Sequence, residues 1–406
     1  MSQKNIAVLF GGRSVEHEVS IVTGHEAMNA IDRSSYNPIP VYITRSGRWL
    51  VGGNLDELIS GSNYRANFST KTFPTDIEPS LDEVTLAARP GLKGLVFLGR
   101  RTSTVKRNRV FEGSIDVLPV DVFMPVLHGT NGEDGCLQGL FELAEVPYTG
   151  CNAISSSLGM NKHLTKSVLL KHGVESLPGV LIPKSALGDL DRAAAGVLEA
   201  LSLPVFVKPC NLGSSVGISN LSVVRSIEDI GPALAQVFRL DSAAIVEPYL
   251  SNLRELQVAV FIGTKRVIAS AVEAPIVKGV NTAASKYGTD MLGGTKDSRR
   301  TGLADAHREF DPSDVPCETL RSVVDTACKV CNVLGCSGVV RVDFFFETKT
   351  NLLYFNEINT LPGSLSYYLF QRKTPPILFT DLLSMLIEAG ESAYASRANF
   401  KRVHVF

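Results

Sequence analysis

The sequence lacks an excess of charge of either sign, and it lacks long hydrophobic runs. Among its 406 residues, 40 Lys and Arg stand against 41 Asp and Glu, for a formal charge of −1. Because duplex nucleic acid is bound by many basic side chains that neutralise phosphates, this balance argues against a nucleic-acid partner. The first apolar run, Ile6 to Phe10, is too short for the core of a signal peptide. No later run approaches the ~18 residues of a membrane span, so we expect a cytoplasmic protein without membrane attachment.

Cysteine is scarce, odd in number and scattered, which argues against a disulfide framework. The seven cysteines are spread from Cys136 to Cys336, as expected for reduced thiols. Two of them, Cys328 and Cys331, have the Cys-x-x-Cys spacing found in zinc and redox sites. However, the surrounding apolar residues recur at helical spacing, and no second Cys or His pair completes four ligands. We interpret the pair as part of a helix rather than a metal site.

Two common nucleotide-binding signatures are also missing. No Gly-Lys dipeptide exists for a Walker-type phosphate loop, and no two glycines stand two apart as in GxGxxG. A nucleotide must therefore be held in another way. One candidate is Lys208, which ends an apolar run and precedes the Gly/Ser segment 213–217. An ammonium and backbone N–H groups suit phosphate oxygens, whereas the alternative is a hairpin turn with a solvated lysine.

Short apolar runs alternate with helical patterns in the first part of the chain, which predicts an α/β fold. The predicted elements are strands at Ile6 to Phe10, Pro38 to Ile43 and Val120 to Leu127, and helices from near Ser14 and at Leu137 to Ala144. They predict an open α/β domain over residues 1–150. Residues 52–118 contain only short strand-like runs, and we interpret them as an excursion from this pattern.

Strands that follow one another closely predict an antiparallel sheet, and hence an α+β character, in the C-terminal part. These strands are Leu256 to Ile262, Val267 to Glu273, Val339 to Phe346 and Leu352 to Ile358. The segment Val277 to Arg300 is rich in Gly, Ser, Thr and Lys. We interpret it as a lid loop, because long loops in compact domains are often functional.

The last two of these strands bring polar side chains together. Strand alternation places Arg341 and Asp343 on one face, and Glu357 and Asn359 on one face. If the strands pair, three oxygen donors and an arginine converge. Oxygen donors suit Mg²⁺ shared with nucleotide phosphates. The alternative is a salt-bridged surface facing water, but the neighbouring phenylalanines leave little free water around these charges.

Polar residues also follow other strand ends, where open α/β sheets bind their ligands. They are Glu16, His128, the pair Lys286 and Tyr287, and the turn Pro362-Gly363. Most of them have a structural alternative. Glu16 suits the first turn of a helix, His128 can be a hydrogen-bonded structural histidine, and Pro-Gly turns are common.

In chain order, these segments resemble the D-alanine–D-alanine ligases of the ATP-grasp superfamily over nearly the whole chain except 52–118. The resemblance rests on GGRSVEHEVS at 11–20, HGTNGEDG at 128–135, PYTG at 147–150, MNK at 160–162, Lys208-Pro209 with GSSVG at 213–217, Lys286-Tyr287, Arg341-Val342-Asp343 and NEINTLPG at 356–363. It implies an ATP-grasp fold preceded by the open α/β domain. The implied domains are 1–150, a central subdomain at 151–247, and a C-terminal subdomain at 248–406 with the lid at 277–300.

The resemblance also implies ATP and two Mg²⁺ ions, with Mn²⁺ as a substitute, between the central and C-terminal subdomains. The implied phosphate ligands are Lys162, Lys208 and Lys286, the adenine and ribose ligands are Glu247 and Glu255, and the metal ligands are Asp343, Glu357 and Asn359. The carboxylate of a first amino acid is phosphorylated, and the amine of a second attacks the acyl phosphate. The implied catalytic residues are a hydrogen-bonded set of Glu16, Ser214 and Tyr287, together with Arg341 and the Gly363 N–H as oxyanion donors. His128 would line the site of the first amino acid.

Departures from the family's pattern concern mainly the second substrate. After the Pro-Gly turn the family has a Thr and then a Ser that meets the acceptor's carboxylate, whereas this chain has Leu365 and Tyr368. The residues ahead of Lys286 are not the usual acidic and aromatic ones, and Pro248 stands where many members have a Lys. The acceptor pocket is therefore the part of the site that differs.

The expected protein is a homodimeric ligase that makes D-alanyl-D-alanine from D-alanine for peptidoglycan. One alternative is a ligase with another acceptor, such as D-serine, D-lactate or a natural-product building block, which Tyr368 would contact. Another is a nucleotide-binding module that has lost catalysis.

Overall fold

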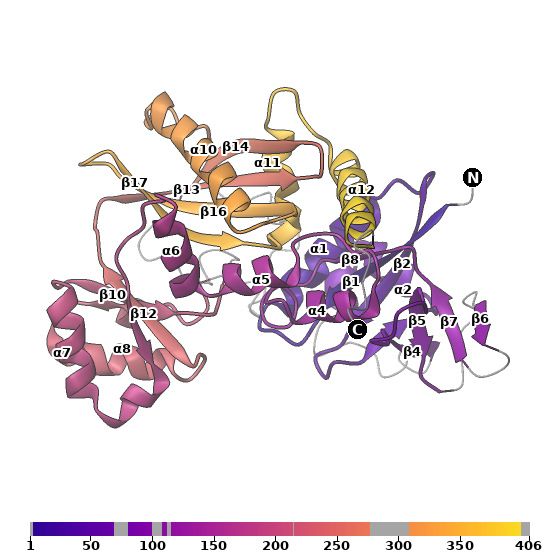
Figure 1. The fold of residues 1–406 in the computed structure, drawn as a ribbon, viewed down its shortest axis with the longest axis horizontal. Helices are drawn as coiled ribbons and strands as arrows, with labels where there is room; N and C mark the ends of the chain where they lie inside the picture. The colour runs from indigo at the N-terminus through magenta and orange to yellow at the C-terminus, as the bar shows by residue number, and fades with distance from the viewer. Residues whose placement is uncertain are drawn as a thin grey trace, which may run out of the picture.

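The computed structural model describes residues 3–68, 80–99, 108–111, 115–213, 215–276 and 308–398. Its strands form three sheets of eight, four and five strands, which follow one another along the chain. The first sheet lies at one end of the molecule and the second at the other (Figure 1). Within these described ranges, no helix has the length and apolar character needed to cross a membrane.

The first sheet is built around β1 (Lys4–Gly11), which pairs in parallel with β2 (Tyr36–Ile43) and β8 (Val122–Pro125). Its strand order is β6-β7-β5-β4-β3-β2-β1-β8. The remaining elements are β3 (Trp49–Val51), β4 (Asp82–Thr85), β5 (Gly94–Phe97), β6 (Asn108–Phe111), β7 (Ile115–Pro119), α1 (His17–Ala30), α2 (Leu55–Ser60), α3 (Tyr64–Asn67) and α4 (Cys136–Ala144). Both faces of β1 are buried, one in a core with α1 and the other in a core with α4, as an α/β arrangement requires.

The structure refines two expectations for this part. The described strands β4 to β7 depart from the strand–helix alternation, as expected of 52–118, but they remain in the first sheet and extend it from β3 by antiparallel pairing. Each has only four or five residues, too few for its alternation to stand out in the sequence. The helix after β1 begins at His17 rather than near Ser14. The Glu16 backbone N–H donates to Ser14 Oγ at 3.1 Å, which holds these residues in a turn.

The second sheet is antiparallel, with strand order β11-β10-β12-β9. Its elements are α5 (Ala153–Met160), α6 (Lys162–Lys171), β9 (Val180–Pro183), η2 (Lys184–Gly188), α7 (Leu190–Ala200), β10 (Val205–Pro209), η3 (Asn220–Ser222), β11 (Val223–Val224), η4 (Ile227–Asp229), α8 (Ile230–Val237) and β12 (Ala243–Pro248). Helices α7 and α8 share a buried hydrophobic core with β10 and β12. Outside this core, polar side chains near the ends of β10 and β12 face the third sheet.

The third sheet is antiparallel, as predicted, with strand order β15-β14-β13-β16-β17. Its elements are β13 (Leu253–Ile262), β14 (Val267–Pro275), β15 (Arg308–Phe310), α10 (Cys317–Val333), β16 (Gly338–Glu347), β17 (Leu352–Asn359), η6 (Gly363–Ser366), α11 (Tyr367–Gln371) and α12 (Phe379–Ala398). Helix α10 packs on one face of the sheet. It contains Cys328 and Cys331, so the prediction of a helix at this pair is confirmed. The other face carries the polar side chains described below.

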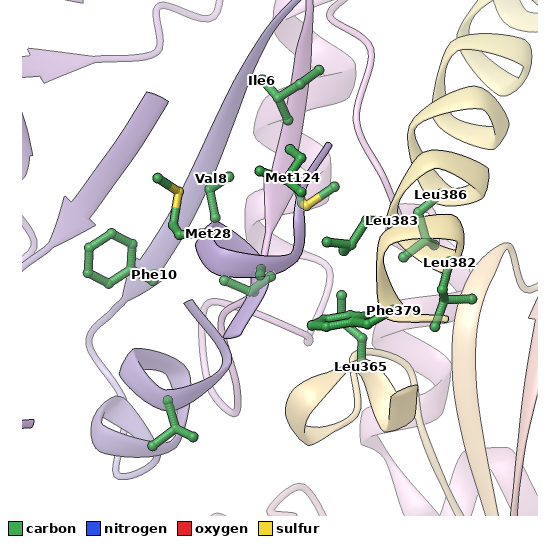
Figure 2. Packing of buried hydrophobic residues seen from close by; sticks show 14 of the residues in the cluster. Ile6, Val8, Phe10, Met28, Met124, Leu365, Phe379, Leu382, Leu383 and Leu386 are labelled. Atoms are coloured by element: carbon green, nitrogen blue, oxygen red, sulfur yellow. The ribbon is translucent and has the colours of Figure 1, made fainter. Parts of the chain in front are cut away.

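The C-terminal helix α12 returns to the first sheet (Figure 2). Leu382, Leu383 and Leu386 lie in one buried cluster with Ile6 and Val8 of β1. The same cluster includes Leu365, on the turn between β17 and α11. This packing holds the turn after β17 against α1, so residues of the first part of the chain can reach it.

Candidate active site

A pocket of about 230 Å³ lies between the second and third sheets. Its walls come from α6, β10, β12, β13, β16 and β17. Six side chains predicted to bind a nucleotide or a metal line it, namely Lys162, Lys208, Glu247, Glu255, Asp343 and Glu357. Pro248, the departure near the implied adenine site, lines it as well.

Glu247 is almost fully buried and is held by two lysines. Lys208 Nζ lies 2.8 Å from Glu247 Oε2, and Lys166 Nζ contacts Glu247 Oε1. Burial alone raises the pKa of Glu247, but the two ammonium groups outweigh it and hold the pKa below its ordinary value. Lys208 Nζ also donates to Asn356 Oδ1 at 3.0 Å, which ties the second sheet to the third.

Lys166 belongs to this network, although the sequence reasoning did not select it. It lies four residues after Lys162 on α6, and residues at this spacing share one face of a helix. Burial, opposed by Glu247, lowers the pKa of Lys166 to about 8. The spacing of the two lysines was the available sequence signal.

Lys162, the first residue of α6, joins this helix to β17. Its Nζ lies 3.1 Å from Glu357 Oε2 and donates to the Leu212 carbonyl at 2.6 Å. Although burial opposes it, the Glu357 carboxylate raises the pKa of Lys162 above its ordinary value. The lysine is therefore a fixed, charged group beside one of the predicted metal ligands.

The predicted cluster of Arg341, Asp343, Glu357 and Asn359 is assembled by the register of β16 and β17. Arg341 lies opposite Asn359, and Asp343 lies opposite Glu357. Opposite residues of an antiparallel pair point to the same face of the sheet. Arg341 Nε and Nη2 donate to the two Asp343 oxygens at 2.7 and 2.8 Å, and Asn359 Nδ2 lies 3.4 Å from Asp343 Oδ2.

The donor set suits a hard divalent cation that takes its other ligands from phosphate. Asp343, Glu357 and Asn359 supply only oxygen ligands, which Mg²⁺ prefers, and Mg²⁺ usually takes one or two carboxylates plus substrate phosphates. Over the described ranges, no group of three His, Cys, Asp or Glu side chains forms a complete metal site. Each carboxylate faces a cationic side chain instead, Arg341 or Lys162.

The first part of the chain contributes a buried acidic pair near this cluster. Glu16 and Glu133 are 6% and 7% exposed. Gly129 has a positive φ of 71°, and a Cβ there would lie 2.6 Å from Glu16 Oε2, so a larger residue would displace this carboxylate. Burial, followed by the charge of Glu16, raises the pKa of Glu133 well above its ordinary value. Burial and mutual repulsion oppose ionisation of both carboxyls, and a cation beside them would favour their charged forms, so the pair suits an ammonium group.

His128 contacts the turn that contains Gly363 rather than remaining within its own domain. Its Nδ1 lies 2.8 Å from the Leu361 carbonyl oxygen, and its Nε2 lies 2.8 Å from Thr23 Oγ1. Since a carbonyl only accepts, Nδ1 carries the proton. Burial lowers the pKa of His128 to about 4, so the ring is neutral. Thr23 also accepts the Ser364 backbone N–H at 3.0 Å, and the sequence reasoning missed this residue.

The two departures near the acceptor pocket have different environments. Leu365 packs in the hydrophobic cluster of α12 and β1. Tyr368 is buried under the guanidinium of Arg308, whose Cζ lies 4.4 Å from the ring centroid. Burial, then the charge of Glu273, raises the pKa of Tyr368 to about 12, so the phenol stays protonated.

Three predicted residues, Ser214, Lys286 and Tyr287, lie outside the residues that the structure describes, as does the lid at 277–300. Their roles stay predictions. Residues predicted from several distant motifs otherwise meet along one face of the third sheet.

Comparisons with known proteins cover nearly the whole chain. A family model described as D-ala D-ala ligase N-terminus matches residues 5–151, and one described as D-ala D-ala ligase C-terminus matches residues 172–388. The D-alanine–D-alanine ligase of Chlorobium phaeovibrioides is 33% identical over 394 residues, which are 96% of this chain and 97% of that protein. The D-alanine–D-alanine ligase of Acetivibrio thermocellus is 31% identical over 97% of both.

Solved structures agree with the sequence comparisons. The VanG D-Ala:D-Ser ligase of Enterococcus faecalis is 28% identical with a TM-score of 0.74, covering 96% of this chain and 100% of that one. The D-alanine–D-alanine ligase of Coxiella burnetii is 25% identical with a TM-score of 0.73, covering 98% and 97%. The fold is an ATP-grasp fold preceded by an α/β domain, as predicted. The chain belongs to the D-alanine–D-alanine ligase family, and it is an ATP-dependent ligase that uses a divalent metal.

Proposed function

We propose that the protein joins the carboxylate of D-alanine to the amine of a second D-alanine, as a step in making peptidoglycan precursors. The observation that carries this proposal is the convergence of two buried lysines, two carboxylates and an arginine at the junction of the second and third sheets. Two anions, a carboxylate and a triphosphate, must meet in this reaction. Cations fixed around one pocket make that encounter favourable.

ATP is assigned to the pocket between these sheets. Lys162 and Lys208 neutralise phosphate oxygens, and Glu255 contacts the ribose. Glu247, oriented by its two lysines, accepts from the adenine amino group. Two Mg²⁺ ions, held by Asp343, Glu357 and Asn359, would neutralise the charge of the transferred phosphoryl group.

The first D-alanine is assigned to the space between Glu16 and the turn at Gly363. Glu16 binds its ammonium group, and His128 lines the site and fixes the turn. A carboxylate oxygen of D-alanine attacks the γ-phosphorus of ATP, and ADP leaves. The amine of the second substrate then attacks the acyl carbon, loses a proton, and inorganic phosphate leaves.

Arg341 and the Gly363 N–H stabilise the oxyanion that forms in this second step. Two of the five guanidinium N–H groups of Arg341 donate to Asp343, so others remain for the substrate. Ser214, Tyr287 and Lys286 complete the site in this proposal, with Lys286 reaching the γ-phosphate. Excluding water protects the acyl phosphate from hydrolysis.

A second candidate function is a D-alanine ligase with a different acceptor. Tyr368 favours it, because a buried phenol stands where the family has a small hydroxyl. The VanG protein among the structural neighbours is named a D-Ala:D-Ser ligase, that is, a ligase with a different acceptor. A module without catalysis is opposed by the retained set of lysines, carboxylates and arginine around the pocket.

The remaining parts of the proposal concern organisation. We assign domains to 1–150, 151–247 and 248–406, since each range holds one sheet, apart from Pro248, which ends β12 of the second sheet. A homodimer and a cytoplasmic location, where ATP is available, complete the proposal.

Mass spectrometry of the products tests the function. The protein is incubated with ATP, Mg²⁺ and a mixture of D- and L-amino acids and D-lactate. D-alanyl-D-alanine as the main product supports the first candidate, and D-alanyl-D-serine or D-alanyl-D-lactate supports the second. ADP formation without any condensed product, or no ATP turnover, would overturn both.

A further inference from the structure

The polar face of the third sheet extends beyond the residues used above. Gln257 lies opposite Asp343 on one side and opposite Glu273 on the other. Residues opposite each other in antiparallel strands point to one face, so Glu273 of β14 shares the face of Asp343. Glu273 is buried and is not needed for ATP or for the metal.

Glu273 has a dedicated partner on the edge strand β15. Arg308 Nη1 donates to both Glu273 oxygens, at 2.8 and 2.9 Å, and the two side chains are 9% and 2% exposed. Charges this deeply buried are weakly screened by solvent, and removing one partner leaves the other uncompensated. The pair is therefore electrically neutral, and removing either side chain leaves a buried net charge on the other.

Arg308 also fixes the ring of Tyr368. Its guanidinium lies over the ring with Cζ 4.4 Å from the centroid, a stacked cation–π geometry that suits arginine. Tyr368 follows the turn at Gly363 by five residues. The charges of Glu273, Arg308 and Arg341 all act on its phenol.

We propose that Arg308 is a positioning residue for Tyr368 and that, with Glu273, it sets the charge of the subsite for the second substrate. This inference rests on the proposed ligase function, because it takes Tyr368 to border the acceptor. The acceptor carries a carboxylate whatever its side chain. Its binding therefore responds to any net charge left on the Glu273–Arg308 pair.

The proposal predicts opposite signs for two changes that each remove one charge of the pair. Arg308→Gln leaves Glu273 anionic and repels the acceptor carboxylate, so the Michaelis constant for the second D-alanine rises about tenfold. Glu273→Gln leaves Arg308 cationic, so the same constant falls. The double variant Arg308→Gln/Glu273→Gln is neutral again and returns most of the way to the wild-type value.

Steady-state kinetics at saturating ATP measure these constants, which do not depend on the fraction of folded enzyme. Arg308→Lys keeps the positive charge but loses the planar guanidinium that lies over the Tyr368 ring. This variant replaces Arg308→Gln in the test if Arg308→Gln does not fold. It should change the preference between D-alanine and D-serine as acceptor more than it changes the Michaelis constant for ATP. Arg254→Gln is the matched control, because Arg254 pairs with Glu309 on the same sheet outside the pocket.

Failure of the proposed ligase function and failure of the proposed role of Arg308 and Glu273 give different results. If the wild-type protein condenses no amino acids, the proposed function fails. If it does, but the single variants leave the second Michaelis constant within twofold, or both raise it together with that for ATP, Arg308 and Glu273 are structural and the inference is overturned.

Discussion

The His128 imidazole and the Leu361 carbonyl are joined by a hydrogen bond of 2.8 Å, although 233 residues separate them in the sequence. On its other side the same ring contacts Thr23 Oγ1, which accepts the Ser364 N–H. The chain Leu361–His128–Thr23–Ser364 thus holds both ends of the turn that contains Gly363. The first part of the chain therefore sets the position of the Gly363 N–H, the proposed oxyanion donor.

Thr23→Val should lower catalytic efficiency without removing any proposed ligand. The change leaves the buried Ser364 N–H without an acceptor, and an unsatisfied buried donor costs about 1–3 kcal/mol of free energy. We expect a lower kcat with the Michaelis constant for ATP nearly unchanged, because the turn rather than the nucleotide pocket is disturbed. Thr23→Ser keeps the hydroxyl and should restore kcat. Equal kinetics for the valine and serine variants would remove Thr23 from the support of this turn.

Glu357→Gln should preserve the fold and reduce ATP turnover by orders of magnitude. One negative metal ligand becomes neutral while its volume barely changes, and Lys162 loses its charged partner. ADP release at saturating Mg²⁺ measures the effect. Glu347→Gln, at the end of β16 and hydrogen-bonded to Thr350, is the control. Near wild-type turnover in the Glu357 variant would exclude it from the metal site.

Much of the third sheet was predictable because its strands are long apolar runs that follow one another closely in the sequence. The two-residue period alone places Arg341 and Asp343 on one face, and the structure joins them by two hydrogen bonds. The strands within 52–118 are too short to produce such a pattern, and β4, which pairs with β3, joins them to the first sheet. The sequence pattern therefore predicted the long strands of the third sheet, but not how the short strands β4 to β7 pair.

The residues that were missed act through distant contacts. Thr23 is a small hydroxyl in a helix, and its partners Ser364 and His128 lie far along the chain. Arg308 is isolated in the sequence, and only the pairing of β15 with β14 brings it to Glu273. No local pattern marks either residue. Lys166 is different, because its helical spacing from Lys162 was visible.

Tyr368→Phe should raise the Michaelis constant for the second D-alanine by roughly tenfold, if the protonated phenol donates to the acceptor carboxylate. The ring and its stacking on Arg308 are kept, so stability and the Michaelis constant for ATP should change little. Tyr367→Phe is the control, because the Tyr367 ring stacks on Phe379 instead. Tyr368→Ser distinguishes the roles further, since a lower constant there means that the ring fills the pocket. Unchanged kinetics in both Tyr368 variants would place the residue outside it.

Glu26→Gln should stabilise the protein above neutral pH. Burial, only partly offset by a hydrogen bond to Ser364, raises the pKa of Glu26 from 4.5 to about 7. Below pH 4.5 the carboxyl is protonated in both states, so its contribution to stability is fully present. Between pH 4.5 and 7 the unfolded chain releases a proton that the folded protein keeps, and stability falls as pH rises.

Above pH 7 the loss of stability from Glu26 is complete, and it amounts to up to about 3 kcal/mol in the free energy of unfolding. The Glu26→Gln variant has no such group, so its free energy of unfolding should exceed that of the wild type by an amount that grows from pH 4.5 to 7. Urea unfolding of both proteins across this range measures the difference, with the exposed Glu57→Gln as control. A difference that does not change with pH would mean that Glu26 ionises in the folded protein as it does in the unfolded chain.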